Sequence, residues 1–110
     1  DTGVGGAVAE IVGRRLGELA AHRQVLCITH LPQVATLADH QLTVQKRTQG
    51  GRTHTQVTLL DQAARVEETA RMLGGLEITE RTREHAREML ARGRAPSPAA
   101  KAQRSRRGRT

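Results

Sequence analysis

The amino-acid sequence predicts an α/β fold whose sheet is incomplete. Residues 24–29 form an unbroken apolar run between polar ends, which is typical of a strand buried on both faces in a parallel sheet. Such a strand needs a neighbour on each side, and the sequence offers no second run of this kind. Helical periodicity and one hairpin pattern account for the other elements. We therefore predict the carboxyl-terminal part of an α/β sheet whose other strands lie elsewhere.

A glycine-rich loop and a helix come first in the chain. Residues 1–6 form the loop, and the periodicity that follows predicts a helix over Ala7–His22. Gly13 and Gly17 weaken this helix but allow another element to approach closely. The apolar positions recur at spacings of three and four: Val8, Ile11, Val12, Leu16, Leu19 and Ala20.

The predicted buried strand, Gln24–Thr29, is followed at its carboxyl end by His30. Pro32 then suits the first turn of a short helix over residues 32–38, because the first helical position needs no N–H donor. The carboxyl end of a buried strand is where α/β folds bind ligands. A histidine there can donate a hydrogen bond to a phosphate oxygen or orient a water. The alternative, a histidine that only caps the strand, is favoured by position alone.

The next segment predicts a β-hairpin with a defined register. If Gly50-Gly51 is a two-residue turn, four cross-strand pairs follow. They are Leu42 with Leu59, Val44 with Val57, Thr43 with Thr58, and Gln45 with Gln56. One face is then apolar and the other polar, as a half-buried antiparallel pair requires.

Two helices are predicted to close the body of the chain. The first, Gln62–Leu73, ends at Gly74-Gly75. The second, Glu80–Arg92, has Thr79 as its N-cap. The residues predicted to face inward are Val66, Ala70 and Leu73 on the first helix, and Ala86, Met89 and Leu90 on the second.

The composition of the 110 residues excludes several classes of function. Without Phe, Tyr or Trp, the chain cannot stack bases on aromatic rings. No apolar run approaches the ~20 residues that a membrane span needs, and the amino end does not resemble a signal peptide. The single Cys27 excludes an internal disulfide framework and favours a reducing, cytoplasmic compartment. Because the first residue is Asp1, we expect a chain processed or cut from something longer.

The positive charge lies mostly at the carboxyl end. Of 18 Lys and Arg residues, six lie in residues 93–110, which contain no acid. With Pro96, Pro98 and no periodic apolar residues, this segment is predicted to be a disordered basic tail. Such a tail either contacts phosphates or is only a solvated arm, and composition does not separate the two. Its nucleic-acid candidates are Arg104, Arg106, Arg107 and Arg109.

Two other features support no assignment by themselves. The Gly-rich loop before a helix can present amides to a phosphate, but the chain contains no Walker A pattern, and such a loop is more often only a turn. One cysteine with scattered histidines does not supply four metal ligands, so no metal site is predicted. Cys27 is expected to be a buried apolar side chain. The scattered histidines are His22, His40, His54 and His85.

Three motifs together resemble the carboxyl end of the RecN family, bacterial DNA double-strand-break repair proteins that belong to the SMC-like branch of ABC ATPases. They are Asp1-Thr2-Gly3-Val4-Gly5-Gly6, then Cys27-Ile28-Thr29-His30-Leu31-Pro32-Gln33-Val34-Ala35, then Arg71-Met72-Leu73-Gly74-Gly75. The resemblance covers about residues 1–92. It implies that these residues form the carboxyl-terminal lobe of an ABC/SMC-type P-loop ATPase head. The tail, residues 93–110, is not part of the pattern.

The resemblance also implies roles for individual residues. His30 matches the switch histidine that senses the γ-phosphate of ATP. The D-loop region, which crosses the interface between two heads, matches Asp1, Thr2, Gly3, Gly5 and Gly6. The implied partners are the remainder of the head, a second head in a homodimer, and DNA at the nucleoid, with ATP and Mg²⁺ as cofactors of the intact protein.

The Walker A loop and the Walker B Asp-Glu pair would lie upstream of residue 1. Phosphoryl transfer needs a phosphate cradle, a Mg²⁺ site and a positioned water. We therefore expect that the 110 residues alone neither hold ATP and Mg²⁺ nor hydrolyse ATP, and that their apolar strand promotes aggregation. The alternative function is a small nucleic-acid-binding module that acts through the basic tail.

Overall fold

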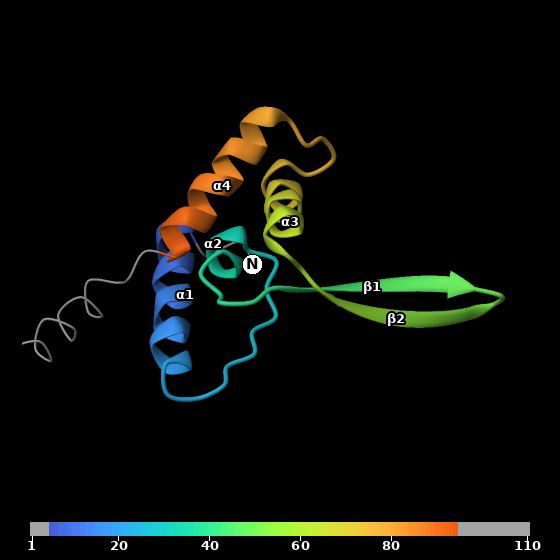
Figure 1. The fold of residues 1–110 in the computed structure, drawn as a ribbon, viewed down its shortest axis with the longest axis horizontal. Helices are drawn as coiled ribbons and strands as arrows, with labels where there is room; N and C mark the ends of the chain where they lie inside the picture. Colours follow the sequence, from blue (N-terminus) through green and yellow to red (C-terminus); the bar gives the residue numbers. More distant parts are fainter. Residues whose placement is uncertain (1–4, 95–110) are drawn as a thin grey trace, which may run out of the picture.

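The computed structural model describes residues 5–94, in which helices gather in a cluster and a β-hairpin projects away from it (Figure 1). Helix α2 contacts both α1 and α3, and α3 packs along α4. The order is α1 (Gly6–Ala20), α2 (Pro32–Ala35), β1 (Leu42–Gln49), β2 (Arg52–Leu59), α3 (Gln62–Gly74) and α4 (Glu80–Arg94). The predicted start of the basic tail at residue 93 is wrong, because α4 continues through Arg94. The rest of that tail, residues 95–110, lies outside the described residues.

The end of α3 and the start of α4 agree with the predicted signals, whereas α1 ends at Ala20 and α2 at Ala35, before the predicted ends at residues 22 and 38. Asp61 caps α3 by accepting a hydrogen bond from the Ala64 N–H at 2.8 Å, and Gly75 ends the helix with a φ of 70°. The N-cap prediction for α4 is confirmed, because Thr79 Oγ1 accepts from the Thr82 N–H at 3.2 Å. Thr82 Oγ1 in turn accepts from the Thr79 N–H at 2.8 Å, which makes the cap reciprocal.

The predicted hairpin register is confirmed in all four pairs, from Leu42 with Leu59 to Gln45 with Gln56. The turn residues Gly50 and Gly51 have φ values of 59° and 77°, which the favoured two-residue hairpin turn requires and glycine adopts without strain. The antiparallel ladder continues to the last pair before the turn, Gln49 with Arg52.

The prediction that one face of the hairpin is buried is wrong for the described residues. Val44 is 66% exposed and its partner Val57 is 59% exposed. The register produces an apolar face, but burial needs a second surface to cover it. The described helices lie at the base of the hairpin and leave this face open (Figure 1).

The prediction of a buried strand over residues 24–29 is also wrong for the described residues. The segment has no regular secondary structure and joins no ladder, and Leu26 and Ile28 are 82% and 97% exposed. The sheet of the described residues has only β1 and β2. An extended segment becomes a strand only when a neighbour satisfies its N–H and C=O groups.

The core is small and is built largely from small side chains. The predicted inward positions Ala70, Ala86, Met89 and Leu90 are buried, whereas Val66 and Leu73 are only partly buried. Helix α1 buries Ala9 and Gly13 and leaves most of its larger apolar residues exposed. It approaches α2 along the narrow stripe of small residues. The exposed residues are Val8, Ile11, Val12 and Leu19.

The two glycines inside α1 lie in different surroundings. A Cβ on Gly13 would lie 2.6 Å from Leu37 Cδ1, so the predicted close approach occurs there, whereas nothing lies within 4 Å of a Cβ on Gly17. We expect Gly17→Ala to raise the free energy of unfolding by about 0.8 kcal/mol, because alanine is the better helix former. Urea unfolding followed by circular dichroism measures this gain. A loss of stability would contradict the open surroundings of Gly17.

Candidate functional site

His30 lies in an exposed bend between the extended segment and α2. Thr29 Oγ1 accepts a hydrogen bond from the Leu31 N–H at 3.0 Å, which closes a turn around His30. Pro32 then begins α2 at its first position, where its fixed φ is already helical. The backbone on both sides of His30 is thus held locally, while the imidazole remains open to solvent.

The amino end of α1 lies beside α2, the helix that begins two residues after His30. Gly5 is the N-cap of α1, and its carbonyl accepts from the Ala9 N–H at 3.1 Å. A Cβ on Gly6 would lie 3.6 Å from Nε2 of Gln33, a residue of α2. The structure therefore brings the predicted loop's last residues to the helix that follows His30. The other predicted loop residues, Asp1, Thr2 and Gly3, lie outside the described residues.

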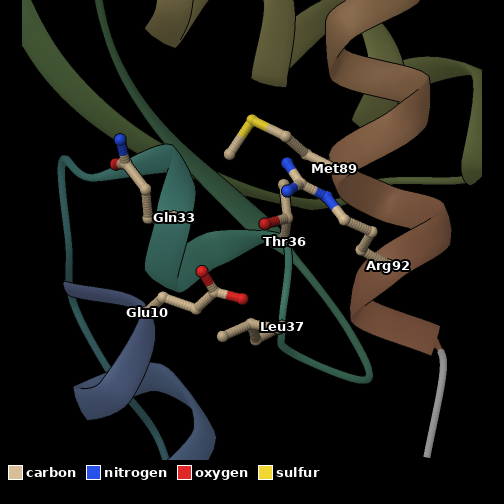
Figure 2. Close-up of a pocket in the computed structure, with 6 residues that line it drawn as sticks. All are labelled: Glu10, Gln33, Thr36, Leu37, Met89 and Arg92. Carbon is tan, nitrogen blue, oxygen red and sulfur yellow. The ribbon is translucent and has the colours of Figure 1, made fainter. Parts of the chain in front are cut away.

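A small cavity lies where α1, α2 and α4 meet (Figure 2). Its volume is about 40 Å³, far below the ~300 Å³ at which small-molecule pockets begin. It has room for ordered water but not for a nucleotide. Figure 2 shows the lining residues Glu10, Gln33, Thr36, Leu37, Met89 and Arg92.

A wider, open groove lies between α3 and α4. Arg87 and Arg94 contribute cations to it, but Arg87 Nη1 is 3.1 Å from Glu80 Oε1. Val66 and Ala91 contribute apolar surface. The groove therefore combines one neutralised arginine with an apolar wall, and it does not lie at the His30 loop.

Arg65 is a residue whose importance the sequence pattern did not reveal. Its side chain is buried and donates to Gln41 Oε1 at 3.2 Å and to the carbonyls of Ala35 and Ala38 at 3.2 and 3.1 Å. Burial lowers the pKa of Arg65, the charge of Arg94 lowers it further, and Asp39 raises it. This guanidinium fixes the segment after α2 to α3 and so supports the helix beside His30.

The remaining predicted residues are not brought together. Cys27 is exposed, so its predicted burial is wrong, because the extended segment that carries it has no partner strand. Within residues 5–94, no three His, Cys, Asp or Glu side chains are close enough together to hold a metal ion. Arg104, Arg106, Arg107 and Arg109 lie outside the described residues. No helix between residues 5 and 94 is long and apolar enough to cross a membrane.

Comparison with known proteins gives consistent matches. The chain is 51% identical over 90 residues to the DNA repair protein RecN of Vibrio cholerae, and 49% identical over 90 residues to that of Halalkalibacterium halodurans. It is 50% identical over 95 residues to RecN of Streptomyces coelicolor. These matches cover 82%, 82% and 86% of this chain but only 16%, 16% and 17% of the relatives. The chain thus spans about a sixth of their length, at the carboxyl-terminal end. No family model matches the chain.

Proposed function

We propose that this chain, which belongs over its matched residues to the RecN family of DNA repair proteins, supplies the carboxyl-terminal part of an ATPase head. In this proposal the head acts in recombinational repair of double-strand breaks, in the cytoplasm at the nucleoid. His30 is its switch histidine, and residues 1–6 are its D-loop region. ATP-dependent engagement of two such heads then changes how the protein holds DNA.

The geometry around His30 is the observation that carries the proposal. The turn closed by Thr29 and the proline at the start of α2 hold the backbone, and the imidazole is free to meet a ligand. Gly6 lies beside the same helix, so both proposed elements adjoin α2. A sensor of phosphate needs this combination of a fixed backbone and an open hydrogen-bonding group.

The residues present fit one part of a nucleotide site. Bound ATP would supply the terminal phosphate, to which His30 is suited to donate a hydrogen bond. The described residues have no cluster of three potential metal ligands, and no step through Mg²⁺ is assigned to them. A cradle for the phosphates and a site for the metal belong, in the proposal, to the rest of the head.

The uncovered apolar surface supports a partner of this kind. Leu26 and Ile28 lie on a segment that joins no ladder among the described residues. A flanking strand would pair with its backbone, and helices packed on the resulting sheet would cover the two side chains. Exposed apolar surface on this scale is typical of an interaction face. The proposed occupant is the remainder of the same head.

We expect His30→Ala to reduce ATP turnover of the full-length protein about 100-fold or more, because a donor aimed at developing charge contributes on that scale. Turnover is measured with and without DNA, and ATP affinity is measured separately by equilibrium binding. His22→Ala is the matched control, since His22 is exposed beyond the last turn of α1.

Unchanged turnover in His30→Ala would overturn the assignment of the switch histidine.

The 110-residue chain alone should hydrolyse no ATP in excess ATP and Mg²⁺. If that chain hydrolysed ATP and His30→Ala abolished the turnover, the described residues would hold a complete site, contrary to the proposal.

Deleting residues 95–110, the part of the basic tail beyond α4, should leave turnover of the full-length protein intact. Loss of turnover would favour a role for the basic tail.

A further inference from the structure

The hairpin carries a concentration of positive charge that the net charge of the body conceals. Residues 42–60 contain Lys46, Arg47 and Arg52 and no acidic residue. The nearest carboxylates, Asp39 and Asp61, lie outside both ends of the hairpin. The hairpin is also the part of the structure that extends farthest from the helices (Figure 1).

The register sorts the side chains of the hairpin onto two different faces. One face is polar along its entire length, and we call it the polar face. The opposite face has Leu42, Val44 and their partners at its base and Lys46 nearer the turn. The polar face consists of Thr43, Gln45, Arg47, Gln49, Arg52, His54, Gln56 and Thr58.

The cations of the polar face are available to a ligand. Arg47 and Arg52 are exposed, and neither forms an ion pair with any residue from 5 to 94. The helices differ in this respect, because several of their arginines are paired with glutamates. Those arginines are Arg14, Arg15, Arg71, Arg83 and Arg87.

We propose that the polar face of the hairpin binds the backbone of duplex DNA through Arg47 and Arg52. A two-stranded ribbon fits the major groove, and arginine, glutamine and threonine side chains are the usual donors to phosphate oxygens. Arg47 and Arg52 occupy diagonal positions of neighbouring pairs on this face, ~7–8 Å apart near the turn, so the two guanidinium groups can contact neighbouring phosphates at the tip of the ribbon. The choice of DNA over other polyanions rests on the proposed function.

The proposal assigns the two faces of the hairpin different tasks. The apolar base, around Val44 and Val57, can pack against protein while the polar face remains open. The polar face also contains Gln45, Gln49 and Gln56. A glutamine side chain can donate a hydrogen bond to a phosphate oxygen, and it can donate to or accept from the edge of a base. Binding here does not involve His30.

The test measures binding of the full-length protein to a fluorescein-labelled 30-base-pair duplex at several salt concentrations. We expect Arg47→Ala combined with Arg52→Ala to weaken binding about 10- to 100-fold at low salt. The slope of log K against log salt should fall by about 2, because two phosphate contacts are removed. The combination Arg47→Lys with Arg52→Lys should retain the slope.

The matched control is Arg23→Ala combined with Arg81→Ala, which removes the same charge from exposed positions elsewhere. Neither Arg23 nor Arg81 forms an ion pair with a described residue. An equal loss in both double variants would mean that only net charge matters, and would overturn the proposal. Displacement of the duplex by polyglutamate at equal charge would overturn it too, by indicating an acidic protein partner. ATP turnover reports on the proposed function and DNA affinity on the hairpin, so either can fail alone.

Discussion

Replacing Arg65 with methionine should lower the free energy of unfolding by about 3 kcal/mol or more. The guanidinium donates to three acceptors, Gln41 Oε1 and the carbonyls of Ala35 and Ala38, at 3.1 to 3.2 Å. Hydrogen bonds to charged groups contribute about 1.5–3 kcal/mol each, although the three contributions are not additive. Methionine occupies much of the volume of the arginine stem, so the loss reports mainly on the polar contacts.

Urea unfolding followed by circular dichroism measures the effect of this substitution. Arg65→Lys keeps a positive charge but cannot match the planar set of donors, so we expect a loss of about half the size. Arg81→Met is the surface control and should change stability by less than about 0.5 kcal/mol. A stability of Arg65→Met equal to that of the parent chain would mean that the three acceptors are satisfied without the guanidinium.

The loss should not depend on pH near neutrality. Burial and the charge of Arg94 lower the pKa of Arg65, and Asp39 partly opposes them. A base with a lowered pKa in the folded state loses its proton first in that state, so any pH dependence would appear only at strongly alkaline pH. An arginine side chain nevertheless remains protonated throughout the range in which the protein can be studied.

Local elements could be predicted from the sequence because their signals are local. The hairpin register follows from two glycines and the alternation of polar and apolar residues, and all four predicted pairs form. The caps of α3 and α4 follow in the same way from Gly75 and Thr79. These features are set by signals close together in the chain: the turn glycines fix the register of the hairpin, and each cap residue acts on the helix end next to it.

Burial could not be predicted in this way because it depends on what covers a face. The apolar run of residues 24–29 was predicted to be buried, yet Ile28 is 97% exposed, and Ile11, on the apolar stripe of α1, is 60% exposed. An apolar pattern indicates that a side chain is suited to burial. It does not indicate whether the element that buries the side chain belongs to the same 110 residues. The same limit applies to the candidate site. Local contacts hold the backbone at His30, but binding of the proposed ligand requires residues of the rest of the head.

Arg65 could have been found with a stricter use of periodicity. It lies one helical turn before Thr69 and one residue before Val66, on the stripe that also contains Ala70. A charged residue on an inward stripe must meet a partner, because burying an unpaired cation is costly. The glycine of the last turn of α4, Gly93, gave no such signal, because its role depends on a contact with α2.

Gly93→Ala should lower the free energy of unfolding by about 2 kcal/mol. A Cβ on Gly93 would lie 2.1 Å from the carbonyl oxygen of Thr36 and 3.0 Å from its carbonyl carbon. Both are backbone atoms at the end of α2, so no side-chain rotation removes the clash. Overpacking of this kind typically costs 1–3 kcal/mol, and it must also outweigh the ~1 kcal/mol that alanine gains in helix propensity.

The sign of this change separates packing from propensity. Gly17→Ala makes the same substitution where nothing lies within 4 Å, and it is expected to stabilise the chain. Opposite signs in urea unfolding of the two variants would establish that the last turn of α4 rests directly on α2. If Gly93→Ala were as stable as Gly17→Ala, α4 would have to end away from Thr36. Because α2 follows His30 directly, a displaced α4 would also loosen the backbone that holds the proposed switch histidine.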